Sequence, residues 1–198
     1  MPHRREVRLI GGSLRKSRLP VLDRPGLRPT PDRVRETLYN WLGQDLSGWR
    51  VLDAFAGSGA LGFEAASRGA AEVLLLEHDA VLVDSLRVSS ARLGAKTVSV
   101  LRANAIAWMG ASARGRYDLV LLDPPFDTAL AQPALAAAAP LVAAGGYLYL
   151  ESDAAWPEPP AGLEPFRDLR AGAVHAQLYR RPAAASPVTS PAANPVVG

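Results

Sequence analysis

The chain has 198 residues, of which 48% are hydrophobic and 21% charged, the composition of a folded domain with a substantial buried core. It contains no cysteine, so disulfides, thiolate metal sites and cysteine nucleophiles are excluded. Residues 1–35 carry ten Lys or Arg and three acidic residues, whereas the remaining residues carry twelve Lys or Arg and sixteen acidic residues. This asymmetry indicates either a polyanionic partner, with nucleic acid the leading choice, or a solvated arginine-rich face.

The first 28 residues are predicted to form a basic extension of the main domain. Residues 6–10 and 18–22 have the character of two short strands, and Gly11-Gly12 lies between them. Two short strands around a glycine pair are typical of a β-hairpin. We therefore expect a hairpin whose positive charge faces the partner.

A helix is predicted directly after this extension. Thr30 is placed to act as its N-cap, and Pro31 suits the first turn because proline has no N–H to leave unpaired there. Arg33 and Glu36 are expected to face outward. The apolar residues at helical spacing that should pack on the core are Val34, Leu38, Trp41 and Leu42.

From residue 50 onward, apolar strands alternate with helices. Strands are predicted at 49–55, 71–77, 97–103, 117–123 and 146–152, with one or two more within 164–180. Helices are predicted at 59–69, at 79–93, from about residue 104, and at 127–143. Near-continuous apolar strands separated by helices indicate a parallel sheet covered on both faces. Ligands of such sheets bind at the carboxyl ends of the strands.

Two further stretches bear on where the chain resides. Residues 129–150 carry no charged side chain, but they are rich in alanine and are broken by two prolines and two glycines, so no membrane span is expected. Residues 182–198 contain four prolines, five alanines and no charge, and are predicted to be a disordered tail. With no secretory signal evident, the expected location is the cytoplasm.

The stretch VLDAFAGSGALG, residues 51–62, carries the pattern G-x-G-x-x-G between a predicted strand and a predicted helix. This pattern is typical of phosphate-binding turns for NAD. However, Asp53 precedes the glycines, and a carboxylate there would repel a pyrophosphate. S-adenosylmethionine has no phosphate, and its sulfonium and α-ammonium groups favour nearby negative charge. The turn therefore favours the methyl donor over the dinucleotide.

Two polar residues at neighbouring strand ends could complete a donor site. Glu77 could accept hydrogen bonds from ribose hydroxyls, although this fits NAD as well as S-adenosylmethionine. Asn104 could accept from the adenine amino group and donate to a ring nitrogen. It is equally placed to be the N-cap of the next helix, and the two roles are compatible.

The sequence Asp123-Pro124-Pro125-Phe126 follows the fourth predicted strand. Two prolines lock the turn and remove two backbone donors, so its carbonyls point outward. The Asp123 carboxylate and the Pro124 carbonyl could accept both N–H groups of an exocyclic amine and aim its lone pair at a methyl group. Phe126 could stack on the base that carries the amine. This pattern predicts methyl transfer to an amino nitrogen.

Together these residues resemble the class I S-adenosylmethionine-dependent methyltransferases that carry [D/N]-P-P-[aromatic]. Within that class, residues 8–181 resemble the bacterial 16S ribosomal RNA guanine-N2 methyltransferases. The specific cues are RLIGGSLRKSRLPV (8–21) and RPTPDRVRETLYNWL (28–42). The resemblance implies a Rossmann-like α/β domain over residues 29–181, with a mostly parallel seven-stranded sheet, helices on both faces and a short N-terminal β-hairpin extension.

The resemblance also implies roles for individual residues and no metal. The S-adenosylmethionine-binding set would be Asp53, Ala56, Gly57, Gly59, Glu77, Asn104 and Ala105. The catalytic turn would be Asp123, Pro124, Pro125 and Phe126. The RNA-facing set would be Arg8, Arg15, Lys16, Arg18, Arg28, Thr30 and Arg35. The chain departs from the family at Asn104, where Asp is usual, and we expect only a weaker adenine contact from this change.

The implied substrate is a guanine of 16S rRNA, in the small ribosomal subunit or in an assembly intermediate, and the implied enzyme is a monomer. Three alternatives stay open. The amine could belong to adenine in DNA or RNA, or to a protein glutamine. The glycine pattern could belong to an NAD-dependent oxidoreductase. The protein could also be an RNA-binding module without activity.

Overall fold

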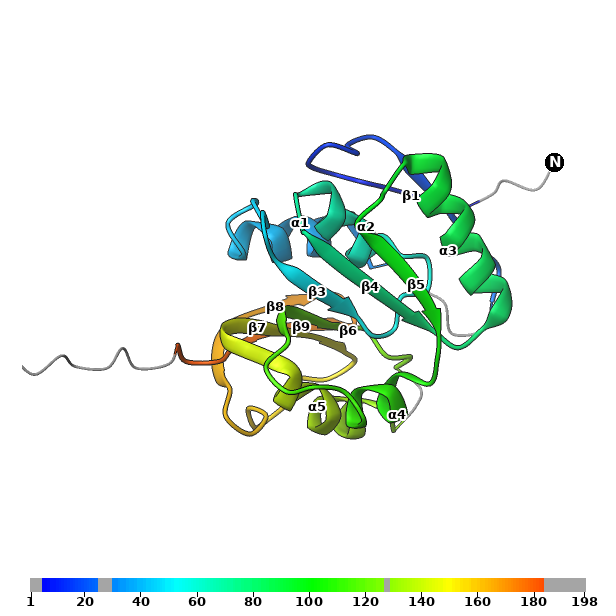
Figure 1. Cartoon of the computed structure of the whole chain (residues 1–198). Coiled ribbons are helices and arrows are strands. Elements are labelled where there is room, and N and C mark those ends of the chain that lie inside the picture. Colours follow the sequence, from blue (N-terminus) through cyan, green and yellow to red (C-terminus); the bar gives the residue numbers. More distant parts are fainter. Residues whose placement is uncertain (1–4, 25–29, 127–128, 184–198) are drawn as a thin grey trace, which may run out of the picture.

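The computed structural model describes residues 5–24, 30–126 and 129–183. Within these residues, seven strands form one sheet in the order β5-β4-β3-β6-β7-β9-β8, and Figure 1 shows it at the centre of the molecule. The strands are β3 (Arg50–Asp53), β4 (Glu72–Glu77), β5 (Val98–Arg102), β6 (Tyr117–Leu122), β7 (Val142–Ser152), β8 (Glu164–Ala171) and β9 (Val174–Arg180). The first five run parallel, and β9 and β8 are added antiparallel. The predicted mostly parallel seven-stranded sheet is confirmed.

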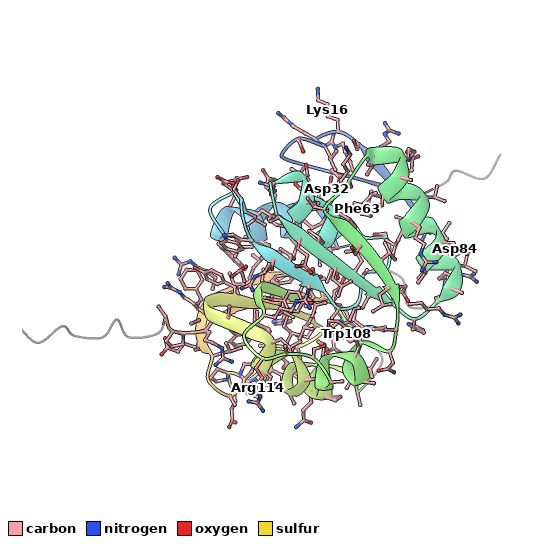
Figure 2. All side chains as sticks on the ribbon, in the orientation of Figure 1. Lys16, Asp32, Phe63, Asp84, Trp108 and Arg114 are labelled. Atoms are coloured by element: carbon pink, nitrogen blue, oxygen red, sulfur yellow. The ribbon has the colours of Figure 1, made fainter. Side chains whose placement is uncertain are left out.

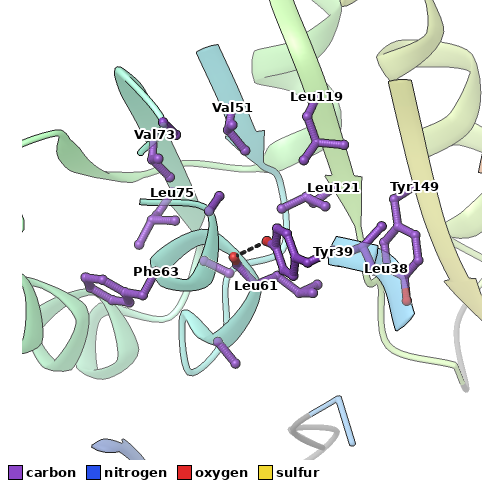
Figure 3. Packing of buried hydrophobic residues seen from close by; sticks show 14 of the residues in the cluster. Leu38, Tyr39, Val51, Leu61, Phe63, Val73, Leu75, Leu119, Leu121 and Tyr149 are labelled. Atoms are coloured by element: carbon purple, nitrogen blue, oxygen red, sulfur yellow. Dashed lines mark hydrogen bonds between the residues drawn. The ribbon is translucent and has the colours of Figure 1, made fainter. Parts of the chain in front are cut away.

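Helices cover both faces of this sheet, as the sequence predicts. On one face lie α1 (Asp32–Trp41), α2 (Ala60–Ser67) and α3 (Ala80–Leu93), and on the other lie α4 (Ala105–Gly110) and α5 (Ala131–Ala138) (Figure 1). Figure 3 shows the first of these two cores, where Tyr39 of α1 lies beside Leu61 of α2 and donates a 2.6 Å hydrogen bond to its carbonyl. The burial of apolar side chains on both faces makes the sheet the rigid centre of the domain.

The strand order reverses between β3 and β6. The chain passes from β3 to β4 on one side of the sheet, and later enters β6 on the other side of β3. In a parallel α/β sheet, a crevice opens at the carboxyl ends of the two strands that flank such a reversal. Asp53 ends β3, and Asp123 directly follows β6, so both acidic residues of the predicted site stand at this point.

The N-terminal hairpin is confirmed. Strands β1 (Arg5–Arg8) and β2 (Arg18–Val21) pair antiparallel, and the loop between them packs on α2 (Figure 1). Gly12 lies at the contact with φ +72°, and a Cβ there would collide with the backbone carbonyl of Ser67. Gly12 is thus required because the loop backbone touches the helix backbone, whereas a Cβ at Gly11 would meet the Arg68 guanidinium.

Glu64, on α2, anchors the hairpin to the domain. Its carboxylate accepts hydrogen bonds from the backbone N–H groups of Ile10 at 2.8 Å and Gly11 at 2.7 Å. The same carboxylate pairs with Arg68 at 2.9 Å and with Arg35 at 3.4 Å. Four partners from three segments therefore converge on one fully buried acid.

Two predicted helix boundaries are wrong. The N-cap of α1 is Pro31, with no side-chain capping bond, because the Thr30 hydroxyl is used elsewhere. The helix predicted at 127–143 is shorter: α5 ends at Ala138, a 3₁₀ turn spans Ala139–Leu141, and β7 begins at Val142. Pro140 removes a helical N–H donor, which ends the helix early. A register shift between β6 and β7 lets β7 include Gly145 and Gly146.

Some predictions fall on residues 1–4, 25–29, 127–128 and 184–198, which lie outside the described residues. These include the RNA contact of Arg28 and nearly all of the predicted disordered tail. Among the residues that are described, no helix is long and apolar enough to cross a membrane.

Candidate active site

A cavity of about 850 Å³ opens at the carboxyl ends of the parallel strands, a volume typical of small-molecule sites. The predicted residues that line it are Thr30, Ala56, Gly57, Glu77, Asn104, Ala105, Asp123, Pro124, Pro125 and Phe126. The glycine turn and the Asp-Pro-Pro-Phe turn therefore share one cavity, as the sequence analysis requires. Gly59 and Asp53 lie behind its wall.

The glycine turn joins β3 to α2 and forms the wall nearest the reversal of strand order. Gly59 is the N-cap of α2 with φ +80°, and a Cβ there would lie 2.6 Å from the ring of Phe63 and 2.7 Å from Leu86. Glycine is needed both for the left-handed backbone and for the close packing of α3. The cavity wall itself is made by the residues just before, Ala56 and Gly57.

Asp53 is 1% exposed and sits beneath this turn. Its Oδ2 accepts a 3.0 Å hydrogen bond from the N–H of Gly62, while Oδ1 has no hydrogen-bond partner among the described residues. Burial raises the pKa of Asp53 to about 7, the Gly62 hydrogen bond opposes this rise, and the nearby Asp123 adds to it. Asp53 is thus a buried acid whose ionised form a cation in the cavity would stabilise.

Glu77 ends β4 at the edge of the cavity. Its Oε2 accepts from the N–H of Gly57 at 3.0 Å, and its Oε1 accepts from the N–H groups of His78 at 2.7 Å and Asp79 at 2.9 Å. Three backbone bonds fix both the carboxylate and the glycine turn. His78 Nδ1 also lies 3.1 Å from Oε1. Of the roughly four acceptor positions of a carboxylate, one therefore remains on Oε2 for a hydroxyl donor.

Asn104 is the N-cap of α4, so the capping interpretation is confirmed. Its Oδ1 accepts a 3.0 Å hydrogen bond from the N–H of Ala107. The side chain also lines the cavity beside Ala105. Since the cap uses Oδ1, the amide offers chiefly its N–H₂ donors to a ligand, and the adenine contact stays a prediction.

Asp123 opens the Asp-Pro-Pro-Phe turn, and its carboxylate faces the cavity. Thr30 donates a 3.2 Å hydrogen bond from its hydroxyl to Oδ2. Burial raises the pKa of Asp123 to about 7, and the threonine hydrogen bond opposes that rise. Thr30 is thus buried in the cavity wall beside Asp123 and does not lie on an outer surface.

Glu151, near the end of β7, is a cavity residue that the sequence analysis missed. It is 2% exposed, and its Oε1 accepts a 2.9 Å hydrogen bond from the hydroxyl of Tyr149. Burial raises the pKa of Glu151 well above its usual range, and the nearby Asp123 adds to the rise. Its position at the carboxyl end of a parallel strand, like that of Glu77, is the signal that could have found it.

The predicted RNA-facing residues divide into two groups. Arg8, Arg15, Lys16 and Arg18 are exposed on the hairpin, and Figure 2 shows Lys16 projecting from its loop into solvent. Arg35 is 0% exposed, so its predicted part in the RNA-facing side is wrong. Its guanidinium instead donates to the carbonyl of Arg8 at 2.8 Å and pairs with Glu64 inside the domain.

Comparison with known proteins identifies the family. The family model described as "Conserved hypothetical protein 95" matches residues 7–180. The ribosomal RNA small subunit methyltransferase D of Escherichia coli strain K12 is 40% identical over 186 residues, which cover 90% of this chain and 91% of that protein. The chain belongs to the family that this model describes, the family of the ribosomal RNA small subunit methyltransferases D. The resemblance drawn from the glycine turn, the proline turn and the two N-terminal cues is confirmed.

Solved structures share the family's fold. A putative methyltransferase of Escherichia coli, yhhF, superposes with a TM-score of 0.80 at 37% identity, covering 90% of this chain and 99% of that one. An RNA methyltransferase of Salinibacter ruber, solved in complex with S-adenosyl-L-homocysteine, has a TM-score of 0.61 at 17% identity and covers 78% and 94% of the two chains. The second likeness concerns the fold alone.

Proposed function

We propose that the protein transfers a methyl group from S-adenosylmethionine to the exocyclic N2 of a guanine in 16S rRNA of the small ribosomal subunit. The observation that carries the proposal is the single cavity shared by the glycine turn and the Asp-Pro-Pro-Phe turn. A relative of nearly equal length that is named as a small-subunit rRNA methyltransferase supports the choice of substrate.

The residues at the glycine turn fit this donor. When bound, S-adenosylmethionine supplies an electrophilic methyl group on a cationic sulfur. Asp53 provides buried negative charge with one unpaired oxygen beneath the turn, which suits a cation and opposes a pyrophosphate. Glu77 has one remaining acceptor position, on Oε2, for a ribose hydroxyl, and Asn104 has amide donors for the base. These contacts are the donor site that we propose.

The proline turn activates the amine. The exocyclic nitrogen of guanine is a weak nucleophile because its lone pair is delocalised into the ring. The Asp123 carboxylate and the Pro124 carbonyl accept its two N–H groups, which draws the lone pair out of the ring plane and toward the methyl group. A carboxyl group with a pKa of about 7 is suited to take up the proton near neutral pH.

The exposed bases of the hairpin would hold the RNA backbone. Arg15 and Lys16 are exposed on the hairpin loop and Arg18 at the start of β2, and Glu64 ties that loop to the domain that carries the cavity. Phosphate contacts of this kind add affinity that falls steeply with salt. The target guanine must leave its stack to reach the recessed Asp123, so we infer an accessible or flipped base.

Mass spectrometry of nucleosides tests the proposal. Purified protein and S-adenosylmethionine with a deuterated methyl group are incubated with small subunits, free 16S rRNA and duplex DNA, each lacking the modification. We expect labelled N2-methylguanosine from 16S rRNA, its absence with the Asp123→Ala variant, and full yield with the exposed-site control Asp84→Ala. Label on adenine alone, on protein alone, or nowhere with the wild-type protein would overturn the proposal.

A further inference from the structure

Asp123, which directly follows β6, and Glu151, near the end of β7, lie at matching positions of these neighbouring strands. Leu122 of β6 is the register partner of Leu150 of β7, and the two acids follow these partners directly. Adjacent parallel strands lie about 4.8 Å apart, and side chains at matching positions point to the same face. Both acids line the active-site cavity. The cavity therefore presents two neighbouring carboxylates, of which the methyl transfer described above uses only Asp123.

The surroundings of Glu151 hold its carboxylate in one orientation. The hydroxyl of Tyr149, two residues earlier on the same strand face, is fully buried and donates to Oε1 at 2.9 Å. Thr30, whose hydroxyl bonds Asp123, also interacts with Glu151, and the Arg35 charge acts on it from α1. A buried carboxylate is costly unless hydrogen-bond donors reach it. A ligand edge rich in N–H groups would supply such donors.

We propose that Glu151 reads the N1–H of the target guanine and so selects guanine over other bases that carry an amino group. The inference rests on the proposed function and extends it to base specificity. Guanine presents N1–H directly beside its N2 amino group, so that Asp123 and Glu151 can each accept from one side of a single edge. Adenine and cytosine present an acceptor nitrogen beside their amino groups. The N1–H of guanine stabilises the ionised form of Glu151 against the burial that raises its pKa, whereas the lone pair of adenine or cytosine repels that form.

The proposal predicts discrimination against an analogue that lacks the N1–H. 2-Aminopurine keeps the 2-amino group but has an unprotonated N1 and no 6-oxo group, so the change in preference between the wild-type protein and a Glu151 variant isolates the contact at N1. We expect the wild-type protein to methylate guanine at least ~100-fold faster in kcat/KM than 2-aminopurine at the same position, because sites built to bind an N–H group reject analogues that lack it. In Glu151→Gln, the side chain can offer an N–H donor to N1. Its guanine rate should fall and its preference should shrink at least ~10-fold.

The experiment uses 16S rRNA that carries guanine or 2-aminopurine at the position identified by the methylation assay, assembled into small subunits. Glu36→Gln makes the same chemical change at an exposed site and should keep the wild-type preference. Tyr149→Phe, which removes only the hydroxyl on Glu151, should reduce the preference partly. Calorimetry with S-adenosylmethionine checks that each variant retains the donor half of the site. If Glu151→Gln no longer binds S-adenosylmethionine, the preference for guanine over 2-aminopurine is compared between Tyr149→Phe and the wild-type protein.

The outcomes separate the two proposals. A wild-type protein that leaves guanine unmethylated ends the proposed function. A wild-type protein that methylates guanine and 2-aminopurine equally well, or a Glu151→Gln variant that loses rate on both bases by the same factor, overturns the role of Glu151 and leaves the proposed function standing. A selective loss of preference in Glu151→Gln supports it.

Discussion

Replacing Asp53 by asparagine should stabilise the fold more strongly as the pH rises, while it weakens binding of the methyl donor. The pKa of this buried acid is about 7 in the folded protein, against about 3.9 in an unfolded chain. The folded state therefore binds the proton more tightly. The stability that this contributes is complete below about pH 4 and is lost as the pH rises through 7. Asparagine carries no charge, so the variant escapes this loss.

The size of the effect follows from the two pKa values. Between pH 5 and pH 8 the wild-type protein should lose roughly 2–3 kcal/mol of unfolding free energy through Asp53, and the variant should lose none of it. For a chain of this length, the difference in Tm between the variant and the wild-type protein should therefore be about 5–10 °C larger at pH 8 than at pH 5. The lost carboxylate should lower donor affinity by about tenfold to a hundredfold, the value of one partly screened charge contact.

Thermal unfolding at pH 5 and pH 8, together with calorimetry using S-adenosylmethionine, measures both effects. Asp84→Asn is the matched control, because it removes the same charge from a side chain that is 75% exposed on α3. That control should show neither the pH-dependent gain nor the loss of affinity. If the stability of Asp53→Asn relative to wild type is the same at both pH values, or if its donor affinity is unchanged, Asp53 lacks the raised pKa or the contact with the donor, respectively.

Three further predictions concern other residues of the site and its support. With saturating donor, the methylation rate should rise about tenfold from pH 6 to pH 8 as Asp123 ionises, and Asp123→Asn should give a flat, low profile; a sloping profile in the variant contradicts the role of that carboxylate. Glu64→Ala leaves two buried guanidinium groups without their shared acid and should cost about 3–5 kcal/mol, with faster tryptic cleavage of the hairpin; an unchanged Tm opposes this. Gly59→Ala should destabilise the turn and weaken donor binding, as measured by calorimetry. The control Gly94→Ala is also at positive φ but has open space around it, so its donor affinity should be unchanged.

Much of the fold can be predicted because its central parallel strands, β3, β4, β6 and β7, are largely buried on both faces. Buried parallel strands are apolar runs, so their number and order of appearance are visible in the sequence. The start of β7 is harder to place. Gly145-Gly146 has the composition of a turn, but pairing with β6 continues through it because a register shift absorbs the extra residues. Pairing between strands that are distant in the chain thus overrides a local signal.

The site is predictable to the extent that its residues follow strand ends. Glu77, Asn104 and Asp123 are found in this way, and the cavity contains all three. Whether a side chain faces the cavity or lies behind its wall depends on the packing of helices, which places Asp53 beneath the turn. The burial of Arg35 could not be predicted for the same reason. It lies next to Val34 on the apolar side of α1, and its guanidinium is buried because it meets the acid Glu64 on α2.

A crystal structure of the protein with S-adenosyl-L-homocysteine would show whether the two turns share one donor site. We expect the sulfur to lie in the cavity between the glycine turn above Asp53 and the Asp123-Pro124 acceptors, with Glu77 on the ribose. A ligand seated in another cleft, or a sulfur that faces away from Asp123, would contradict this expectation.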